Sequence, residues 1–303
     1  MRAEQRFPAM GTDVHVIAVA GSARTAAAAL ERARERIDDL EARWSRFRAT
    51  SEVSLLNALA GTPVRVSPET VALVQRALDG VRLTGGRFDP TVLGAVVRAG
   101  YDRTYARIRP GASPRDDRAL GAPLIEVDPV ARLVRLPAGV GFDPGGIGKG
   151  LAADIVVREL RGRVDGICVN VGGDLRASGR APDGLAWGVD VEDPFGGASR
   201  GVLSLREGAV ATSSRTRRVL PGGHHLIEPA TGRPASGDVA SATVIAGQGW
   251  IAEVLAKAAF LAGRLEGCGL LAAAGVEGML VLDDGRERRT AGYERFLVQE
   301  AAA

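Results

Sequence analysis

Lysine is almost absent from this chain, and its two lysines lie in the two segments best suited to carry chemistry. The 303 residues include 39 Lys and Arg residues, of which only Lys149 and Lys257 are lysines. An ammonium group is a compact charge that can share a proton, whereas a guanidinium group stays protonated. Lysines that persist in an arginine-rich chain are therefore candidates for an active site, with chance placement as the alternative.

Lys149 belongs to the glycine-rich segment GGIGKG, residues 145–150, which is predicted to open a helix. A phosphate-binding loop of the Walker A type needs Gly where Asp143 stands and Ser or Thr where Gly150 stands, and a dinucleotide-binding GxGxxG needs Gly at Leu151. Neither pattern fits. Successive glycines at a helix N-terminus still expose N–H groups to an anion. The alternative is a tight turn that is capped by Asp143.

Two of the three histidines, His224 and His225, are adjacent in the segment HHLIEP. Neighbouring side chains of an extended segment point to opposite faces, so only one of the two can enter a given pocket. This disfavours a metal site made of both histidines. We expect one functional histidine, with the other one exposed.

The composition excludes several classes of protein. A net charge of +3 and 4% aromatic residues argue against a nucleic-acid partner. Two cysteines cannot form a disulfide framework, which fits a reducing compartment. No apolar run reaches the ~20 residues of a transmembrane helix, and the N-terminus shows neither a signal core nor a lipid-acceptor cysteine. We expect a cytoplasmic protein, or an extracytoplasmic one if a signal segment has been removed.

Helical and strand patterns are mixed along the chain without strict alternation, which favours an α+β fold, with mixed sheets and flanking helices, over a doubly wound sheet. No linker divides the sequence, so one domain over residues 1–303 is expected, with a variable surface loop near residues 109–123. The main expected elements are helices at 25–44, 51–60, 67–84 and 251–261, a hairpin at 125–136, and strands at 15–20, 167–171, 239–246 and 296–298.

Seven segments together resemble the ApbE family, the FAD:protein FMN transferases. In order along the chain they are AMGTDVHV, WSRFRATSEVSLLN, GRFDPTVLG, FDPGGIGKGLAAD, VNVGGDL, ATSS with HHLIEPATGRP, and IAEVLAKAA. Each string alone is weak, but seven in family order are specific. The resemblance implies a single ApbE-like, T-fold-like domain.

The resemblance also implies an activity. The chain would bind FAD, transfer the FMN moiety to a threonine hydroxyl of an acceptor flavoprotein and release AMP. Such a phosphotransfer needs neutralised charge on the pyrophosphate and an in-line hydroxyl group. Two alternatives remain open: an FAD-binding protein without transfer activity, and an FAD pyrophosphatase that gives FMN and AMP.

The family pattern suggests a role for individual residues. FAD binding falls to Met10, Phe47, Arg87, Phe88, Asp89, Asp143 and Lys149. The pattern also suggests catalytic roles for His225 and Asp143 and a Mg²⁺ site at Gly146 and Glu253. Lys257 is a third catalytic candidate, which rests on a departure of this chain from the family pattern and not on the pattern itself.

The chain departs from its family in the late helix. Relatives carry Asp and, four residues later, Thr as metal ligands, whereas this chain has Glu253 and Lys257. An ammonium group cannot bind a cation. One interpretation is an exposed i,i+4 ion pair worth ~0.3–0.5 kcal/mol. The other is that Glu253 holds Lys257 near the FAD pyrophosphate, so that dependence on Mg²⁺ is weakened.

Overall fold

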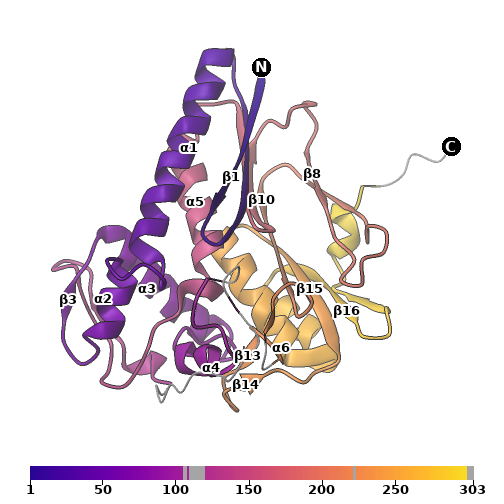
Figure 1. The fold of residues 1–303 in the computed structure, drawn as a ribbon. Coiled ribbons are helices and arrows are strands. Elements are labelled where there is room, and N and C mark those ends of the chain that lie inside the picture. Colours follow the sequence, from indigo (N-terminus) through magenta and orange to yellow (C-terminus); the bar gives the residue numbers. More distant parts are fainter. Residues whose placement is uncertain (105–107, 109–119, 221–222, 299–303) are drawn as a thin grey trace. The chain divides into compact units, whose positions relative to one another are not determined.

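The chain forms two compact units, each assembled from segments that are separated in the sequence. The computed structural model describes residues 1–104, 108, 120–220 and 223–298 (Figure 1). Unit 1 comprises residues 1–37, 149–214 and 238–303, and unit 2 comprises residues 38–148 and 215–237. One domain over residues 1–303 stays a prediction.

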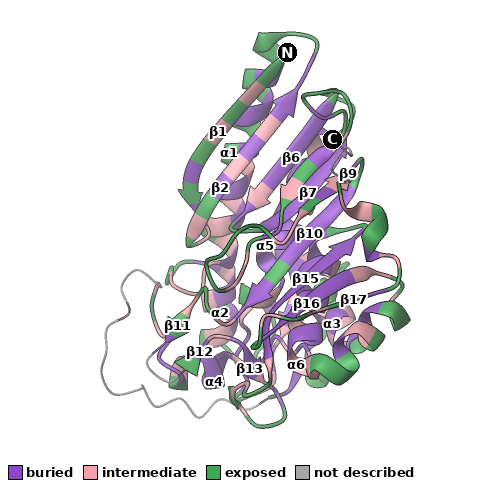
Figure 2. Cartoon of the chain, turned by 90° about the vertical axis from the view of Figure 1, so that its right-hand side faces the viewer, coloured by how far each residue is buried: buried purple, intermediate pink, exposed green. Residues whose placement is uncertain are grey.

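An eight-stranded sheet forms the centre of unit 1, and each strand pairs antiparallel with its neighbours. In sheet order the strands are β1 (Arg2–Ala9), β2 (Thr12–Val19), β6 (Gly166–Val171), β7 (Asp174–Gly179), β10 (Gly208–Ser214), β15 (Val239–Ala246), β16 (Glu277–Leu282) and β17 (Glu287–Arg289). Every residue of β15 is buried, as Figure 2 shows. The predicted α+β class is confirmed, but the prediction of mixed sheets is wrong for this sheet, since all of its strand pairs are antiparallel.

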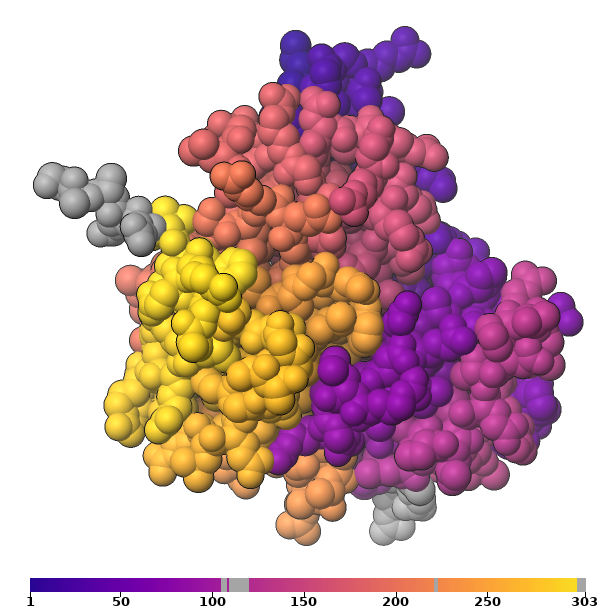
Figure 3. All heavy atoms as spheres, turned by 180° about the vertical axis from the view of Figure 1, so that it is seen from behind, coloured from indigo at the N-terminus to yellow at the C-terminus, as the bar shows by residue number. Residues whose placement is uncertain are grey.

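Helices cover one face of this sheet. The buried side of α1 (Ala23–Trp44) and that of α5 (Gly148–Leu160) pack on β1, β2 and β6. Helix α6 (Gly249–Ala273) packs on β10, β15 and β16. Gly263 interrupts α6 with a φ of 72°. Figure 3 shows α6 (orange) beside the segments that follow it (yellow).

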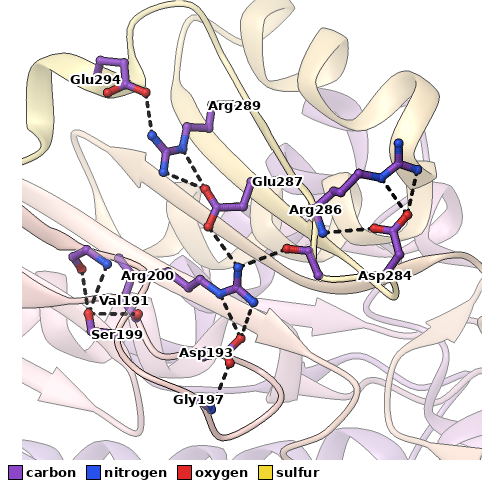
Figure 4. Close-up of polar contacts among 12 residues, drawn as sticks. Val191, Asp193, Gly197, Ser199, Arg200, Asp284, Arg286, Glu287, Arg289 and Glu294 are labelled. Atoms are coloured by element: carbon purple, nitrogen blue, oxygen red, sulfur yellow. Dashed lines mark hydrogen bonds and ion pairs between the residues drawn. The ribbon is translucent and has the colours of Figure 1, made fainter.

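The other face of the sheet carries a second layer made by the hairpin of β8 (Trp187–Asp190) and β9 (Val202–Leu205) and by the 3₁₀ helix η4 (Tyr293–Phe296). Ion pairs tie this layer to the sheet edge (Figure 4). Arg200 bonds Asp193 at 2.8 Å and Glu287 at 3.3 Å, and Arg289 bonds Glu287 and Glu294 at 2.6 Å each.

Unit 2 consists of short elements. They are the end of α1, α2 (Glu52–Ala58), β3 (Val64–Arg65), α3 (Pro68–Leu83), α4 (Leu93–Arg98), the 3₁₀ helices η2 (Ala122–Leu124) and η3 (Pro144–Gly146), β4 (Glu126–Asp128), β5 (Leu133–Arg135), β11 (Val219–Leu220), β12 (Gly223–His224), β13 (Ile227–Glu228) and β14 (Arg233–Pro234). Ser51 and Ser67 cap α2 and α3, since each hydroxyl accepts a backbone N–H three residues later.

Three expectations need correction or limitation. The strand predicted at 296–298 is absent, because Phe296 ends η4 and Leu297 makes only an isolated bridge. Helix α6 begins earlier and ends later than predicted. Of the loop expected near 109–123, residues 109–119 lie outside the described residues, and Gly121 and Ala122 are buried. None of the helices in the described ranges combines the length and apolar character needed to cross a bilayer.

Candidate active site

The N-termini of α5 and α6 meet in unit 1 at two glycines. A Cβ atom added to Gly150 would lie 2.5 Å from the carbonyl carbon of Gly249, and one added to Gly249 would lie 2.5 Å from the carbonyl oxygen of Gly150. Real Cβ atoms do not approach a backbone so closely. Gly150, in the glycine-rich segment predicted to open a helix, therefore allows the backbones of α5 and α6 to come into close contact.

Each of the two helices caps the other with a carboxylate. Asp154 of α5 accepts the backbone N–H groups of Gly249 and Trp250 at 2.8 and 3.0 Å, while Glu253 of α6 accepts the N–H of Gly150 at 2.8 Å. These bonds satisfy N–H groups that the first turn of a helix leaves open. Burial raises the pKa of Asp154, although the two N–H groups act against it.

Both lysines of the chain converge on Glu253. The Nζ of Lys149 lies 3.0 Å from Oε1 of Glu253, and the Nζ of Lys257 lies 3.4 Å from the same oxygen. Lys149 also forms a close ion pair with Asp174, the first residue of β7. The expected i,i+4 ion pair of Glu253 with Lys257 is therefore present, but it is not an exposed pair, because the side chain of Glu253 is only 1% exposed.

The charges in this cluster compensate one another. Burial alone would raise the pKa of Glu253, but the ammonium groups of Lys149 and Lys257 outweigh it and lower that pKa. Two ammonium groups face two carboxylates, those of Glu253 and Asp174. We define these four residues as the lysine cluster.

The lysine cluster does not fit a magnesium ion. Oε1 of Glu253 faces two ammonium groups, and Oε2 accepts the N–H of Gly150. Mg²⁺ needs oxygen ligands in near-octahedral arrangement, and neighbouring cations would repel it. No group of three or more His, Cys, Asp or Glu side chains suited to a metal occurs among the described residues. The assignment of Glu253 and Gly146 to Mg²⁺ remains a prediction that this donor set does not favour.

Met10, the other FAD residue expected in unit 1, lies at the tip of the β1–β2 hairpin. Met10 and Gly11 have φ angles of 53° and 69°, the left-handed region in which glycine and asparagine are common and methionine is rare. The side chain is half-buried against the core of unit 1. A residue held in a disfavoured conformation is compatible with the role expected for Met10.

Asp143 and Phe47 are linked in unit 2 by a residue that the sequence analysis did not select. Asp143 caps the short 3₁₀ helix η3 by accepting the N–H of Gly145 at 3.0 Å, and not α5, which begins at Gly148. It also faces Arg46, whose Nε lies 3.4 Å away. The guanidinium group of Arg46 lies over the ring of Phe47.

The expected RFD segment follows α3. Phe88 is buried, and its N–H donates to the hydroxyl of Thr84 at 3.0 Å. Asp89 accepts the N–H and the hydroxyl of Thr91 at 2.7 and 2.5 Å, which orders the turn into α4. Arg87 is half-buried. These contacts are structural, and FAD binding by the three residues stays a prediction.

The two histidines differ from expectation in one respect. His224, the residue expected to be exposed, is buried, and His225 is half-buried. Nδ1 of His224 accepts the N–H of Leu226 at 3.2 Å, and Nε2 faces the carbonyl oxygen of Ala235 at 3.0 Å. This pattern requires a neutral ring with its proton on Nε2. Burial, with a further contribution from Arg215, lowers the pKa of His224.

We expect this buried histidine to make unfolding pH-dependent. Because its pKa is lower in the folded than in the unfolded state, its contribution is complete above the unfolded value of about 6.5 and is lost as the pH falls below it. Urea unfolding at pH 7.5 and 5.5 measures this loss. In His224→Gln, whose amide can replace both bonds without titrating, the loss should be smaller; an unchanged pH dependence would contradict the assignment.

Comparison with known proteins agrees with the resemblance found in the sequence. Residues 10–280 match the model of the ApbE family. The chain is 34% identical to the FAD:protein FMN transferase of Treponema pallidum over 90% of this chain and 83% of that protein, and 27% identical to that of Vibrio cholerae over 96% and 91%. The ApbE protein of Thermotoga maritima has a similar structure, with a TM-score of 0.88 at 26% identity, covering 99% of this chain and 100% of that one.

Proposed function

Because the chain belongs to the ApbE family, we propose that it is an FAD:protein FMN transferase, which moves the FMN moiety of FAD onto a threonine hydroxyl of an acceptor flavoprotein. The observation that carries this proposal is the similarity to FAD:protein FMN transferases over 90% or more of the chain. The expected substrates are therefore FAD and a protein that bears the target threonine.

The reaction in this proposal is a displacement at phosphorus. The threonine oxygen attacks the phosphorus atom of the FMN half, the bond from that phosphorus to the bridging oxygen breaks, and AMP leaves with the bridging oxygen. The hydroxyl proton must pass to a base. His225 and Asp143, both in unit 2, are the proposed acceptors of this proton.

Lys257 has the proposed role of offsetting negative charge as AMP departs. Glu253 fixes its position through the ion pair at 3.4 Å, and the side chain of Lys257 keeps 15% of its surface exposed, so a ligand can reach it. Lys149 sits at the N-terminus of α5, where backbone N–H groups also favour an anion. Fixed positive charge of this kind stabilises a phosphotransfer transition state.

We expect transfer without a strong requirement for Mg²⁺ at Glu253. The ammonium groups of Lys149 and Lys257 already pair with the oxygen of Glu253 that a cation would need as a free ligand. Transfer in EDTA should retain most of the rate measured with Mg²⁺, and Lys257→Thr should gain metal dependence. Saturable Mg²⁺ dependence that Glu253→Ala abolishes and Lys257→Ala leaves unchanged would contradict this expectation.

Incubation of the protein with FAD and a candidate acceptor tests the function itself. Covalent flavin in the acceptor, followed by in-gel fluorescence and mass spectrometry, supports transfer. Free FMN and AMP without labelled acceptor would support a pyrophosphatase instead. FAD that is bound but unchanged would support a binding protein. An acceptor with its target Thr replaced by Val is the matched control.

A further inference from the structure

Arg46 is a buried cation in unit 2 that lies beside two aromatic rings. Its Cζ atom lies 4.2 Å from the ring centroid of Phe47 and 4.5 Å from that of Tyr101, and the two rings are 5.6 Å apart. Only 8% of the arginine side chain is exposed. Such contacts hold the guanidinium plane in one orientation, which a lysine could not provide.

The hydrogen bonds of Arg46 are incomplete. Its Nε atom lies 3.4 Å from Oδ1 of Asp143. Its Nη2 atom is buried and has no hydrogen-bond partner in the described part of the chain. A guanidinium group carries five N–H donors and no acceptor, and a buried donor without an acceptor is unfavourable. The unit thus orients a donor for which it supplies no acceptor.

The charge around Arg46 favours an acceptor that is itself anionic. A second guanidinium group, that of Arg218, also lies near Tyr101, with its Cζ atom 5.9 Å from the ring centroid. Asp143 and Asp102 are two acidic groups near Arg46, and Asp102 is bonded to Arg103 at 2.7 Å. Asp143 already accepts the N–H of Gly145. Planar guanidinium groups suit phosphate oxygens because two donors can bind in parallel.

We propose that Arg46 is a further substrate-binding residue, whose Nη2 donates to an oxygen atom of the bound flavin dinucleotide. The inference rests on the proposed function for the identity of the ligand. The positive charge of Arg218 favours a phosphate oxygen as the acceptor. A carbonyl oxygen of the flavin ring can accept the same hydrogen bond. The rings of Phe47 and Tyr101 orient the donor in either case.

Calorimetry with Arg46→Met tests the proposal, because methionine keeps an apolar stem against the rings and removes every donor. We expect the affinity for FAD to fall at least tenfold. If a phosphate is bound, affinity for FMN or ADP falls and that for riboflavin is unchanged. If a ring oxygen is bound, FMN and riboflavin weaken equally and ADP is unchanged. FAD affinity within twofold of the wild type would overturn the proposal.

The matched control is Arg48→Met, two residues along the same loop. Arg48 is exposed and pairs with Glu41 at 3.0 Å, so its loss should leave FAD affinity unchanged. Circular dichroism and thermal unfolding establish that each variant is folded. If Arg46→Met does not fold, Arg46→Leu, which also removes every donor, takes its place, and unchanged FAD affinity in that variant overturns the proposal equally. Wild-type binding and transfer are measured first, so a failure of the proposed function is recognised separately.

Discussion

Gly249→Ala is expected to destabilise the protein severely, by ~3 kcal/mol or more in the free energy of unfolding. The new Cβ atom would lie 2.5 Å from the carbonyl oxygen of Gly150 and 3.1 Å from its Cα, and both are backbone atoms that no side-chain rotation can move. The helices would have to separate, which would break the bonds from Gly249 and Trp250 to Asp154. Urea unfolding followed by circular dichroism measures the change.

Gly269→Ala is the matched control in the same helix. A Cβ atom at Gly269 meets nothing within 4 Å, so alanine should be neutral or should stabilise the helix by up to ~1 kcal/mol. Equal unfolding free energies for the two variants would show that the contact of α5 with α6 is more tolerant than its geometry implies.

Local sequence signals predicted the helices α2 and α3 well, because the causes of these two helices are local. Ser51 and Ser67 each precede a helix and accept the backbone N–H of the residue three positions later. Pro68 is the first residue of α3, where the helix needs no N–H donor. The hairpin at 125–136 is confirmed as β4 and β5 for a similar reason, since its turn begins at Asp128-Pro129. In α2, however, Leu55 is exposed, as is the C-cap residue Leu59, whereas Val53 and Leu56 are buried. The direction of the core is set by distant residues, so the local pattern does not predict it.

The lysine cluster could be predicted only in part. The scarcity of lysine marked Lys149 and Lys257, and the i,i+4 spacing predicted the pair of Glu253 with Lys257. The pair of Lys149 with Glu253 spans 104 residues, and no local pattern encodes such a distance. No local pattern singles out Asp174, which in the structure opens β7 and pairs with Lys149.

Arg46 escaped selection for a different reason. The roles that the family pattern suggests include one for Phe47 but none for Arg46. In an arginine-rich chain, the residue type alone does not distinguish one arginine as functional. Its significance comes from burial and from a donor without an acceptor, which only a three-dimensional arrangement can reveal.

The boundary between the two units could not be predicted from the sequence either. It lies between residues 37 and 38, inside the continuous helix α1, so the sequence shows no break there.

Glu253→Gln is expected to lower the free energy of unfolding by ~3 kcal/mol, although the two side chains have nearly the same shape. The amide removes the negative charge and leaves the ammonium group of Lys257 without its only carboxylate in the described ranges. Lys149 retains Asp174, and both lysine side chains keep about 15% of their surface exposed, which holds the loss near the lower end for a buried ion pair. Chemical denaturation in high and low salt measures it.

A double variant separates the charge from the shape. If the destabilisation comes from an uncompensated ammonium group, Glu253→Gln/Lys257→Met should recover ~1–2 kcal/mol relative to Glu253→Gln, because the methionine fills the same space without a charge. The exposed Glu266→Gln in α6 should change stability by less than ~0.5 kcal/mol. A double variant no more stable than Glu253→Gln would mean that the destabilisation does not come from the uncompensated ammonium group of Lys257.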